Sequence, residues 1–488
     1  MKTDASIHPM VHDFRIDVTA NAPEQALNII GIFPDGTYTS DHCTNLAMTT
    51  QNNYVKTGER AFLSPNVLVI GVDRPNTPKK WQELGAKMVK SAPADRICAL
   101  LVDTLSGQEA ASMAYGCQLA SWRLERYHTK ARPLPQRCKH VCLVTPLAEQ
   151  ESLKMQRALD DHLIQSIHWA RDIANRPGND ITPHRFMQCV EALKTLGVQV
   201  TVLDQSDLEK QGFGALLGVA QGSINKPYVV TATWMGTGEN QPITALVGKG
   251  VTFDTGGISI KPSNNMGEMK LDKTGAVVVA ATVRALAAQK APVNVVAVLA
   301  LVENMPSGSA QRPGDIVHSL SGQTIEVLDT DAEGRLILAD VLTYAQNQFK
   351  PETIIDVATL TGAVRVALGP VYAGLCSDDA PLVHSIIESG QKTGELVWHL
   401  PLHEDYDKAM DSTCADMKNI AGPGFGAGSS TAAQFLKRFV AKDQKWAHLD
   451  IAGVDMFQRD TLLCPHGGSA FGIQLLTHWV THHAAPTS

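Results

Sequence analysis

Two stretches of the sequence gather ionisable residues at spacings that suit metal binding. The first, VGKGVTFDTGGISIKPSNNMGEMKLDKTG, spans residues 247–275 and follows an apolar run that is typical of a buried strand. The second, LDTDAEGRLILAD, spans residues 328–340 and carries another group of carboxylates. Because open α/β sheets place their sites just beyond strand ends, we expect the two stretches to meet there. Together they supply enough carboxylates for two divalent metal ions, and cations remain to face a substrate.

The carboxylates of these stretches are hard oxygen ligands that suit Mg²⁺, Mn²⁺ or Zn²⁺. Two metal ions that share carboxylates can hold both a water nucleophile and the bond that it attacks. Asp331 and Glu333 are two residues apart, and on an extended segment they point the same way. In isolation such a pair is typical of a solvated acidic turn. The metal interpretation depends on its combination with Asp254 and Asp272 in one chain.

Two other groups of residues only partly match metal-binding motifs. Cys138 and Cys142 bracket His140, but no second pair of ligands follows, so this segment is interpreted as the entry to a strand. His478 and His482 have the spacing of a helical metal pair, but near the chain end a solvated tail is the simpler interpretation. Neither group adds a metal centre to the prediction.

The composition is that of an ordinary globular chain. The 488 residues exceed what one hydrophobic core usually organises, and 44% are apolar and 19% charged. The formal charge of -7 gives no support to a nucleic-acid-binding surface. The opening residues lack the apolar core of a secretory signal, no run is long enough to span a membrane, and nine scattered cysteines fit a reducing compartment. We therefore expect a cytoplasmic protein of two or three domains.

Residues 1–149 are expected to form a small α/β domain that serves as a scaffold or in assembly. Residues 150–175 have the apolar spacing of one long amphipathic helix, which we interpret as a domain connector. Pro177 disfavours helix in the residue before it, so the connector is expected to end there. In the first domain the expected strands are Leu27–Phe33, Asn66–Val72, Arg96–Val102 and His140–Thr145, and the expected helices are Trp81–Lys90 and Gln108–Arg126.

Residues 176–488 are expected to form the catalytic domain. Strand and helix patterns alternate there as they do in a mainly parallel sheet covered on both faces. Thr182 and Pro183 mark the start of its first helix. The expected strands are Val198–Leu203, Tyr228–Trp234, Ile243–Gly248, Val293–Val302 and Thr353–Ala358, with helices at Asp272–Gln289 and Gly334–Gln346. The predicted fold class is α/β, with a small N-terminal domain, a connecting helix and a larger domain that carries a dinuclear metal site.

Six motifs occur in one order along the chain: GKGVTFDTGGISIKP, ENMPSG, RPGDIV, TDAEGRL, ATLTGA and WAHLDIAG. In these motifs the sequence resembles the leucine aminopeptidase (cytosol aminopeptidase) family, including its bacterial aminopeptidase A and peptidase B members. The resemblance covers roughly residues 150–475, and the N-terminal region is similar only in length and layout. It implies an enzyme that releases amino-terminal residues from peptides by metal-activated water attack on the first peptide bond.

The resemblance also implies roles for individual residues. Two divalent metal ions, Mn²⁺, Zn²⁺ or Mg²⁺, are expected on the residues that match the family's ligands, which are Lys249, Asp254, Asp272, Asp331 and Glu333. Lys261 and Arg335 match the catalytic residues, and the arginine is expected to hold a bicarbonate that acts as general base. The positions that match the lining of the pocket for the first substrate side chain are Met269, Thr359, Gly362 and Ala452. A homohexamer, built as a dimer of trimers, is implied as well.

These roles agree with the chemistry of the residues. Lys249 can ligate a metal only as the neutral amine, and two adjacent dications would lower its pKa. Lys261 would remain an ammonium that stabilises the negative oxygen formed as water attacks the scissile carbonyl. The planar guanidinium of Arg335 matches a carboxylate-like anion with two parallel hydrogen bonds.

Three residues depart from the family pattern. Asp329 stands where Asn is usual, which adds a possible negative charge beside the ligands, and Lys273 stands where Met is usual. Asp455 lies at a position that borders the first-residue pocket and is commonly apolar or small. If its carboxylate faces the pocket, it would attract a Lys or Arg side chain of the substrate. If it points into solvent at a strand end, it has no such effect.

A rival interpretation is a catalytically weak family member that acts mainly as a DNA-binding or structural oligomeric protein. The complete set of ligands and both catalytic cations favour the enzyme, and the acidic net charge gives no support to DNA binding. Peptides with a free amino terminus are therefore the expected partners, whereas a membrane or nucleic acid is not expected.

Overall fold

The computed structural model describes residues 14–23, 25–32, 60–64, 67–71, 74–92, 96–129, 138, 140–145, 147–238 and 241–484. It divides into two compact units. The N-terminal unit runs to His168 and includes Arg459–His466, whereas the C-terminal unit comprises Trp169–Gln458 and the chain from Gly467 onward. The division falls inside one continuous helix, α4 (Leu147–Asn175), which covers the region of the expected connector.

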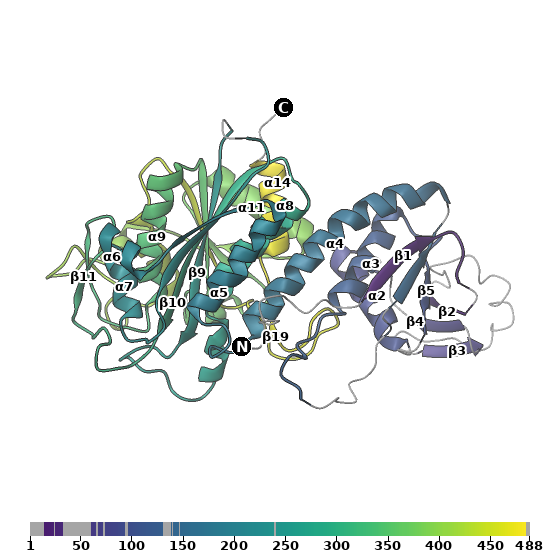
Figure 1. The fold of residues 1–488 in the computed structure, drawn as a ribbon, viewed down its shortest axis with the longest axis horizontal. Helices are drawn as coiled ribbons and strands as arrows, with labels where there is room; N and C mark the ends of the chain where they lie inside the picture. Colours follow the sequence, from purple (N-terminus) through teal and green to yellow (C-terminus); the bar gives the residue numbers. More distant parts are fainter. Residues whose placement is uncertain are drawn as a thin grey trace. The chain divides into compact units, whose positions relative to one another are not determined.

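The described part of the N-terminal unit forms a six-stranded sheet with the strand order β1-β6-β5-β2-β4-β3 (Figure 1). Among the described strand pairs of this sheet, only β3 and β4 are antiparallel. Two helices, α2 and α3, pack closely against each other beside it. Glycine at position 116 of α3 allows this contact, since a Cβ there would lie 1.9 Å from the carbonyl oxygen of Gln82 on α2. The elements are β1 (Arg15–Thr19), β2 (Leu27–Ile32), β3 (Arg60–Ser64), β4 (Val67–Gly71), α2 (Pro78–Ser91), β5 (Cys98–Leu101), α3 (Gly107–Leu119) and β6 (His140–Val144).

The expected strands and helices of this unit are present, but β1 and β3 were not predicted, and α3 ends at Leu119, whereas the expected helix ran to Arg126. The sequence of β1, RIDVT, contains two charged residues in five, so it lacks the apolar run of a buried strand. As an edge strand it is exposed along one side, which tolerates such residues. The expected strand ends at Phe33, Asn66 and Val72 lie outside the described residues.

The C-terminal unit is built on an eight-stranded sheet in the order β15-β14-β17-β13-β9-β10-β8-β7. Its four central strands, β17, β13, β9 and β10, are parallel, so their carboxyl ends lie at the same edge. This arrangement confirms the predicted α/β class with a mainly parallel central sheet. The strands are β7 (Gln199–Leu203), β8 (Tyr228–Met235), β9 (Thr244–Asp254), β10 (Asn294–Asn304), β13 (Thr353–Ala358), β14 (Ala373–Cys376), β15 (Val397–His399) and β17 (Lys445–Asp450); small sheets join β11 (Ile316–His318) to β12 (Thr324–Glu326) and β16 (Met417–Lys418), and β18 (Met456–Phe457) to β19 (Gly467–Gly468).

Helices cover both faces of this sheet (Figure 1). α8, with α14 and α11 behind it, packs on β9, β10 and β13, whereas α7, α9 and α13 close the core on the other face. None of the described helices has the length and apolar character of a membrane span. The helices are α5 (Pro183–Glu191), α6 (Gln205–Gln211), α7 (Gly214–Ala220), α8 (Thr274–Ala288), α9 (Gly334–Phe349), α10 (Gly362–Leu368), α11 (Ala380–Thr393), α12 (Glu404–Lys408), α13 (Gly428–Lys437) and α14 (Ile473–His483), with 3-10 turns η2 (Ala192–Leu196) and η3 (Met266–Leu271).

Small residues let α8 approach the sheet closely. A Cβ on Gly275 would lie 2.1 Å from the carbonyl oxygen of Val357 on β13, and a Cβ on Gly248 would lie 2.5 Å from Cα of Ala276. Glycine is therefore required at both positions. This contact fixes the segment just before α8 against the ends of the central strands.

Strand β9 is longer than the sequence predicted. The expected strand ends at Gly248, but the observed strand continues to Asp254, so Lys249 lies within it. The prediction stopped early because charged side chains are rare in strands that are buried on both faces. Here they are tolerated because each has a partner from outside the strand: Lys249 pairs with Asp272, and Asp254 pairs with Lys261. As a result, the strand itself positions two of the ionisable residues.

Asp340 on α9 is a buried carboxyl whose raised pKa makes the stability of the fold depend on pH. Its two oxygens accept hydrogen bonds from the backbone N–H groups of Leu216, at 2.9 Å, and Leu320, at 2.7 Å. Burial raises the pKa of Asp340 to about 7, although these hydrogen bonds oppose the rise. The folded state therefore holds a proton that the unfolded chain releases near pH 4.

We expect the stability of the protein relative to the variant Asp340→Asn to fall as pH rises from about 4 to 7. The folded-state pKa lies above the unfolded one, so this carboxyl disfavours the folded state increasingly across that window, by up to about 4 kcal/mol. Urea unfolding of both proteins at pH 5 and pH 7.5 measures the difference. Identical pH dependence in the two proteins would contradict the assignment.

Candidate metal centre

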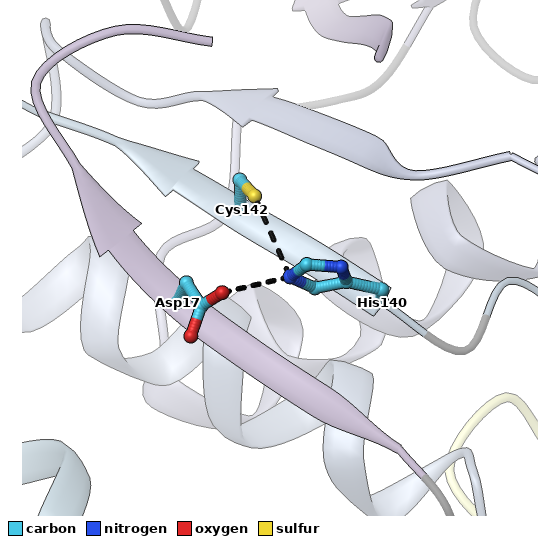
Figure 2. Close-up of side chains that lie close together, drawn as sticks. All are labelled: Asp17, His140 and Cys142. Atoms are coloured by element: carbon cyan, nitrogen blue, oxygen red, sulfur yellow. Dashed lines mark hydrogen bonds and ion pairs between the residues drawn. The ribbon is translucent and has the colours of Figure 1, made fainter. Parts of the chain in front are cut away.

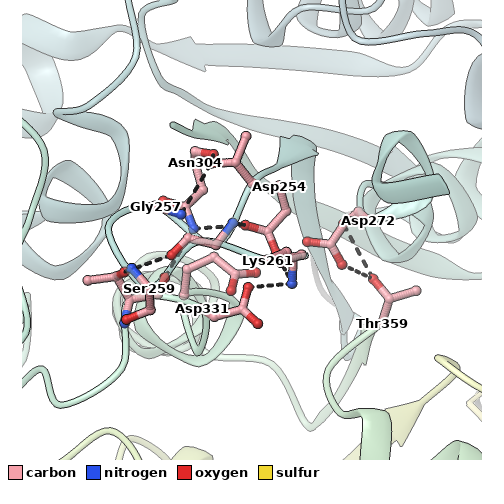
Figure 3. Close-up of polar contacts among 12 residues, drawn as sticks. Asp254, Gly257, Ser259, Lys261, Asp272, Asn304, Asp331 and Thr359 are labelled. Atoms are coloured by element: carbon pink, nitrogen blue, oxygen red, sulfur yellow. Dashed lines mark hydrogen bonds and ion pairs between the residues drawn. The ribbon is translucent and has the colours of Figure 1, made fainter. Parts of the chain in front are cut away.

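The structure brings the two ionisable stretches together at the carboxyl ends of the central strands (Figure 3). Residues 249 and 254 lie on β9, and residue 261 lies in the loop that follows. Residue 272 follows η3, and the second stretch leads into α9. The predicted residues gathered here are Lys249, Asp254, Lys261, Asp272, Asp331, Glu333 and Arg335.

Three carboxylates form the middle of the site. Asp254, Asp272 and Glu333 are buried and offer oxygen atoms that all lie within 4.8 Å of one another. Burial raises the pKa of Glu333 to about 7, while Lys249 lowers it and Asp272 raises it further. Oδ2 of Asp272 is buried without a hydrogen-bond partner. A buried carboxylate oxygen without a donor costs free energy, so these residues fit a bound divalent cation.

Lys249 lies against this cluster as its counter-charge. Its Nζ is 2.9 Å from Asp272 Oδ1 and 2.8 Å from Glu333 Oε1, and it donates to the carbonyl oxygen of Thr359 at 2.9 Å. Burial lowers the pKa of this amine, but the surrounding carboxylates outweigh burial and raise the pKa above its usual range. Gly334 allows the approach, since a Cβ there would lie 2.7 Å from Nζ. In the absence of bound cations, Lys249 is therefore an ammonium.

Lys261 joins the two stretches on the other side of Asp254. Its Nζ is 2.8 Å from Asp254 Oδ2 and forms a second ion pair with Asp331 Oδ1. Asp254 Oδ1 accepts hydrogen bonds from Gly256 N, at 2.9 Å, and from Asn304 Nδ2, at 2.8 Å. Asn304 therefore orients this carboxylate; it lies in the ENMPSG motif but was not among the predicted site residues.

Asp331 and Glu333 reach the site in a way that the sequence analysis described wrongly. The segment is a turn, and Glu333 has helical angles of φ -80 and ψ -34 as the N-cap of α9, so the two residues are not on an extended segment. Glu333 contacts Lys249, whereas Asp331 contacts Lys261. Burial and the charge of Asp254 raise the pKa of Asp331 to about 6.

Asn419 fixes the turn that carries these acids. Its Nδ2 donates to the carbonyl oxygen of Asp329 at 2.6 Å, and its Oδ1 accepts from Leu328 N at 2.8 Å. Asp329 in turn accepts a hydrogen bond from Asp331 N at 2.9 Å through Oδ1. An asparagine oxygen could accept the same bond, so the departure at residue 329 leaves this turn intact. No motif in the sequence pointed to Asn419.

Arg335 is buried beside the acids in the first turn of α9. Its Nη1 donates to the carbonyl oxygen of Asn419 at 2.6 Å, and its Nε is buried without a partner. Burial lowers the pKa of Arg335 to about 10, so it remains a guanidinium at neutral pH. A buried cationic N–H without an acceptor fits a small bound anion.

The expected pocket residues occupy different environments. The Thr359 hydroxyl donates to Asp272 Oδ1 at 2.7 Å, so it orients a carboxylate. Gly362 is exposed at the start of α10, and a Cβ there would meet no atom within 4 Å. Met269 and Ala452 are half-buried. The buried Asp450, which the sequence analysis missed within WAHLDIAG, accepts hydrogen bonds from Leu360 N, Thr361 Oγ1 and Ala452 N.

Asp455 is half-buried near the end of the WAHLDIAG segment. Burial raises the pKa of its carboxyl to about 8, and Arg365 is the cation that opposes the rise. The carboxyl is therefore mainly protonated at pH 7 unless a further cation approaches it.

Lys273, the second departure from the family pattern, is fully buried. Its Nζ donates to the carbonyl oxygens of Ala174 and Arg176, each at 3.1 Å, and to that of Lys270. Burial lowers the pKa of Lys273 to about 7, but only the ammonium form offers a donor to each of the three oxygens. The side chain thereby ties the end of α4 to the segment that carries Asp272.

A mainly parallel α/β sheet with buried carboxylates and lysines at its strand ends is typical of an enzyme with a metal centre. The model of the cytosol aminopeptidase family, catalytic domain, matches residues 168–477. The chain therefore belongs to the cytosol aminopeptidase family and is a metal-dependent aminopeptidase. This result confirms the resemblance seen in the sequence and does not favour the DNA-binding or structural alternative.

Individual relatives agree with this assignment. The chain is 47% identical over 441 residues to a probable cytosol aminopeptidase of Brucella melitensis biotype 1, covering 87% of this chain and 89% of the relative. It is 43% identical over 435 residues to a probable cytosol aminopeptidase of Rickettsia bellii, covering 87% and 86%. Among solved structures, the bottromycin maturation enzyme BotP in complex with Mn is similar with a TM-score of 0.82 and 29% identity, covering 94% of this chain and 99% of BotP.

Proposed function

We propose that this aminopeptidase uses a dinuclear metal centre to hydrolyse the first peptide bond of peptides with a free amino terminus. The observation that carries the proposal is the buried cluster of Asp254, Asp272 and Glu333, in which one oxygen of Asp272 lacks any partner. Lys249 and Lys261 balance only part of the charge of the carboxylates gathered here, and bound cations would balance the rest. Metal ions bound to the cluster would take part directly in hydrolysis.

The proposed metal ligands are those predicted from the sequence. Lys249, Asp254, Asp272, Asp331 and Glu333 would hold two divalent ions, and the oxygen-rich donor set suits Mn²⁺, Zn²⁺ or Mg²⁺. The manganese in the BotP structure supports Mn²⁺ as the first metal to test. When bound, the metals supply a polarised substrate carbonyl and a water of lowered pKa.

Two cations of the chain would act on the reacting atoms. The ammonium of Lys261 would leave its carboxylate partners for the substrate and stabilise the negative charge that develops on the scissile carbonyl oxygen. Arg335 would hold a bicarbonate through the partnerless Nε, and the bound anion would supply a general base beside the scissile bond.

Hydrolysis of leucine p-nitroanilide with Mn²⁺, measured beside gel shifts on random DNA, tests the proposed function. We expect turnover that is lost on chelation and recovered with Mn²⁺, and no shift of DNA. The variant Glu333→Gln, which keeps the shape of the side chain, should lose activity. Specific DNA binding without turnover would overturn the proposal.

Metal binding should release protons from the centre. Lys249 is an ammonium in the absence of cations and can ligate a metal only after losing its proton. We expect Mn²⁺ binding at pH 7 to release at least about one proton per chain. Calorimetric titrations in buffers of different ionisation enthalpy measure this number. The variant Lys249→Met should release fewer protons, and equal release in both proteins would remove Lys249 from the ligand set.

We also propose that Asp455 borders the pocket for the first substrate side chain, with Met269, Gly362 and Ala452. A Lys or Arg side chain that approaches the half-buried carboxyl would draw it into its ionised form. We expect Asp455→Ala to lower the ratio of kcat/KM for Arg over Leu substrates by about 5-fold or more. An unchanged ratio would leave selectivity to Met269 and its neighbours.

A homohexamer, as a dimer of trimers, and a cytosolic location are proposed from the family resemblance. Exposed apolar side chains support assembly: Val366 is 90% exposed, and Trp398, which contacts the ring of Tyr372, is 56% exposed. The name of the curated relatives and the absence of disulfides among the described cysteines support the cytosol. Sedimentation analysis of the purified protein tests the assembly.

A further inference from the structure

A second group of potential ligands lies in the N-terminal unit, on strands β1 and β6. Asp17 on β1 pairs with Cys142 on β6 in the parallel register, so their side chains leave the sheet on the same face. His140 precedes Cys142 by two residues on β6 and therefore shares that face. Figure 2 shows the three side chains gathered together, with dashed lines from the His140 ring to both Asp17 and Cys142.

The spacing of the donor atoms is close to that of a tetrahedral metal site. His140 Nε2 lies 2.8 Å from Asp17 Oδ2 and 3.8 Å from Cys142 Sγ. Donor atoms of the three residues all lie within 4.8 Å of one another. Zinc bonds of about 2.0 Å to nitrogen or oxygen and about 2.3 Å to sulfur place tetrahedral ligands roughly 3.3 to 3.6 Å apart. The two His140 distances lie on either side of this range, so small shifts of these side chains would bring His140 to ligand spacing from both partners.

The surroundings of the cluster suit a site with one position open to water. Cys142 is buried, whereas the Asp17 and His140 side chains are 31% and 29% exposed. Arg15 binds the other oxygen of Asp17, Oδ1, at 2.9 Å, which leaves Oδ2 directed at His140. Burial and the charge of Asp17 raise the pKa of the Cys142 thiol, and a bound dication would oppose both effects.

Cys138 does not belong to this cluster, although the sequence places it symmetrically about His140. Its Sγ contacts the carbonyl oxygen of His140 at 3.0 Å, and it packs in the core that faces α2 and α3. Cys142 belongs to the small core on the opposite face of the sheet. Because β6 begins at His140, the alternation of a strand does not extend back to Cys138. Asp17, far away in sequence, supplies the third donor instead.

We propose that Asp17, His140 and Cys142 bind one Zn²⁺ ion, or a similar borderline transition metal, separately from the centre at the ends of β9 and β13. Thiolate and imidazole ligands favour such metals over Mn²⁺ and Mg²⁺. The Cys142 thiol loses its proton on binding, and water completes the coordination. The ion joins the edge strand β1 to β6, so it stabilises the N-terminal unit by an amount that grows with the logarithm of the metal concentration above Kd.

Titration of the full-length protein with Co²⁺ tests this proposal independently of activity. The proposed ligands of the other centre include no sulfur, so a thiolate-to-cobalt charge-transfer absorption in the near ultraviolet reports only on a cysteine site. We expect this absorption in the native protein and its loss when Zn²⁺ competes. It should be absent from Cys142→Ser and retained in Asp272→Ala, which instead impairs the other centre.

Cys414→Ser is the matched control, because Cys414 is the exposed cysteine among those described. Loss of the absorption in this control, or its persistence in Cys142→Ser, would overturn the assignment. No absorption in the native protein would show that Asp17 and His140 form only an ion pair. Should Cys142→Ser fail to fold, His140→Ala retains the thiol and should bind Co²⁺ at least about 10-fold more weakly. Equal affinity in His140→Ala would also refute the site.

Discussion

Replacing Lys261 by Ala is expected to lower kcat by about 100-fold or more while metal content stays near two ions per chain. In the proposed function Lys261 acts on the transition state and is not a ligand. Its partners Asp254 and Asp331 would not be left as unpaired charges in the variant, because the bound metals neutralise them. Activity with leucine p-nitroanilide and metal analysis of the same sample measure both quantities.

Two further variants separate catalysis from metal binding. Asp272→Ala should lose metal, because Asp272 is one of the three buried carboxylates of the cluster. Lys226→Ala removes an exposed lysine and should change neither quantity. Equal loss of metal in the Lys261 and Asp272 variants would contradict the separation of roles.

Replacing Lys273 by Met, the residue usual in the family, is expected to lower the free energy of unfolding by about 1–3 kcal/mol, because the cost of burying the amine offsets part of the lost hydrogen bonds. The thioether offers no donor, so the carbonyl oxygens of Ala174, Arg176 and Lys270 would lose the ammonium that they share. A buried polar group left without its partner costs about 1–3 kcal/mol. We therefore expect that the family's usual Met cannot replace Lys273 in this chain without loss of stability.

The stability of Lys273→Met is best measured by urea unfolding with a chelator present, so that metal binding does not contribute. Lys270→Met is the matched control, since Lys270 takes part through its carbonyl oxygen and not through its side chain. We also expect about 10-fold weaker Mn²⁺ binding in Lys273→Met, because the segment that carries Asp272 loses its tie to α4. Equal stability of the two variants would show that the carbonyl oxygens find other donors.

Local sequence determined the elements that are regular and buried. The strand Thr353–Ala358 was predicted with its observed ends, since a short apolar run between turns has few other interpretations. The helix that begins at Pro183 was predicted from its cap, and Thr182 Oγ1 accepts a hydrogen bond from Arg185 N at 3.3 Å as expected. The motifs and their order were sufficient to predict the family, because both are read directly from the sequence without any knowledge of tertiary contacts.

Tertiary structure alone decided which charges meet. Sequence spacing suggested that Asp331 and Glu333 act as a pair, but the turn before α9 directs them to different lysines. Asn304 and Asn419 hold the acids from distant segments, and a neutral amide in a sequence gives no sign of its hydrogen-bond partner.

The Asp17–His140–Cys142 cluster depends in the same way on the pairing of β1 with β6, which joins residues 123 positions apart. Sequence patterns report the period of a strand or helix, and so they show which residues share a face. They do not report which strand lies beside it, because that choice is made by the packing of the whole sheet. The types of chemical group available to this protein were therefore determined by its sequence, and their partners by its fold.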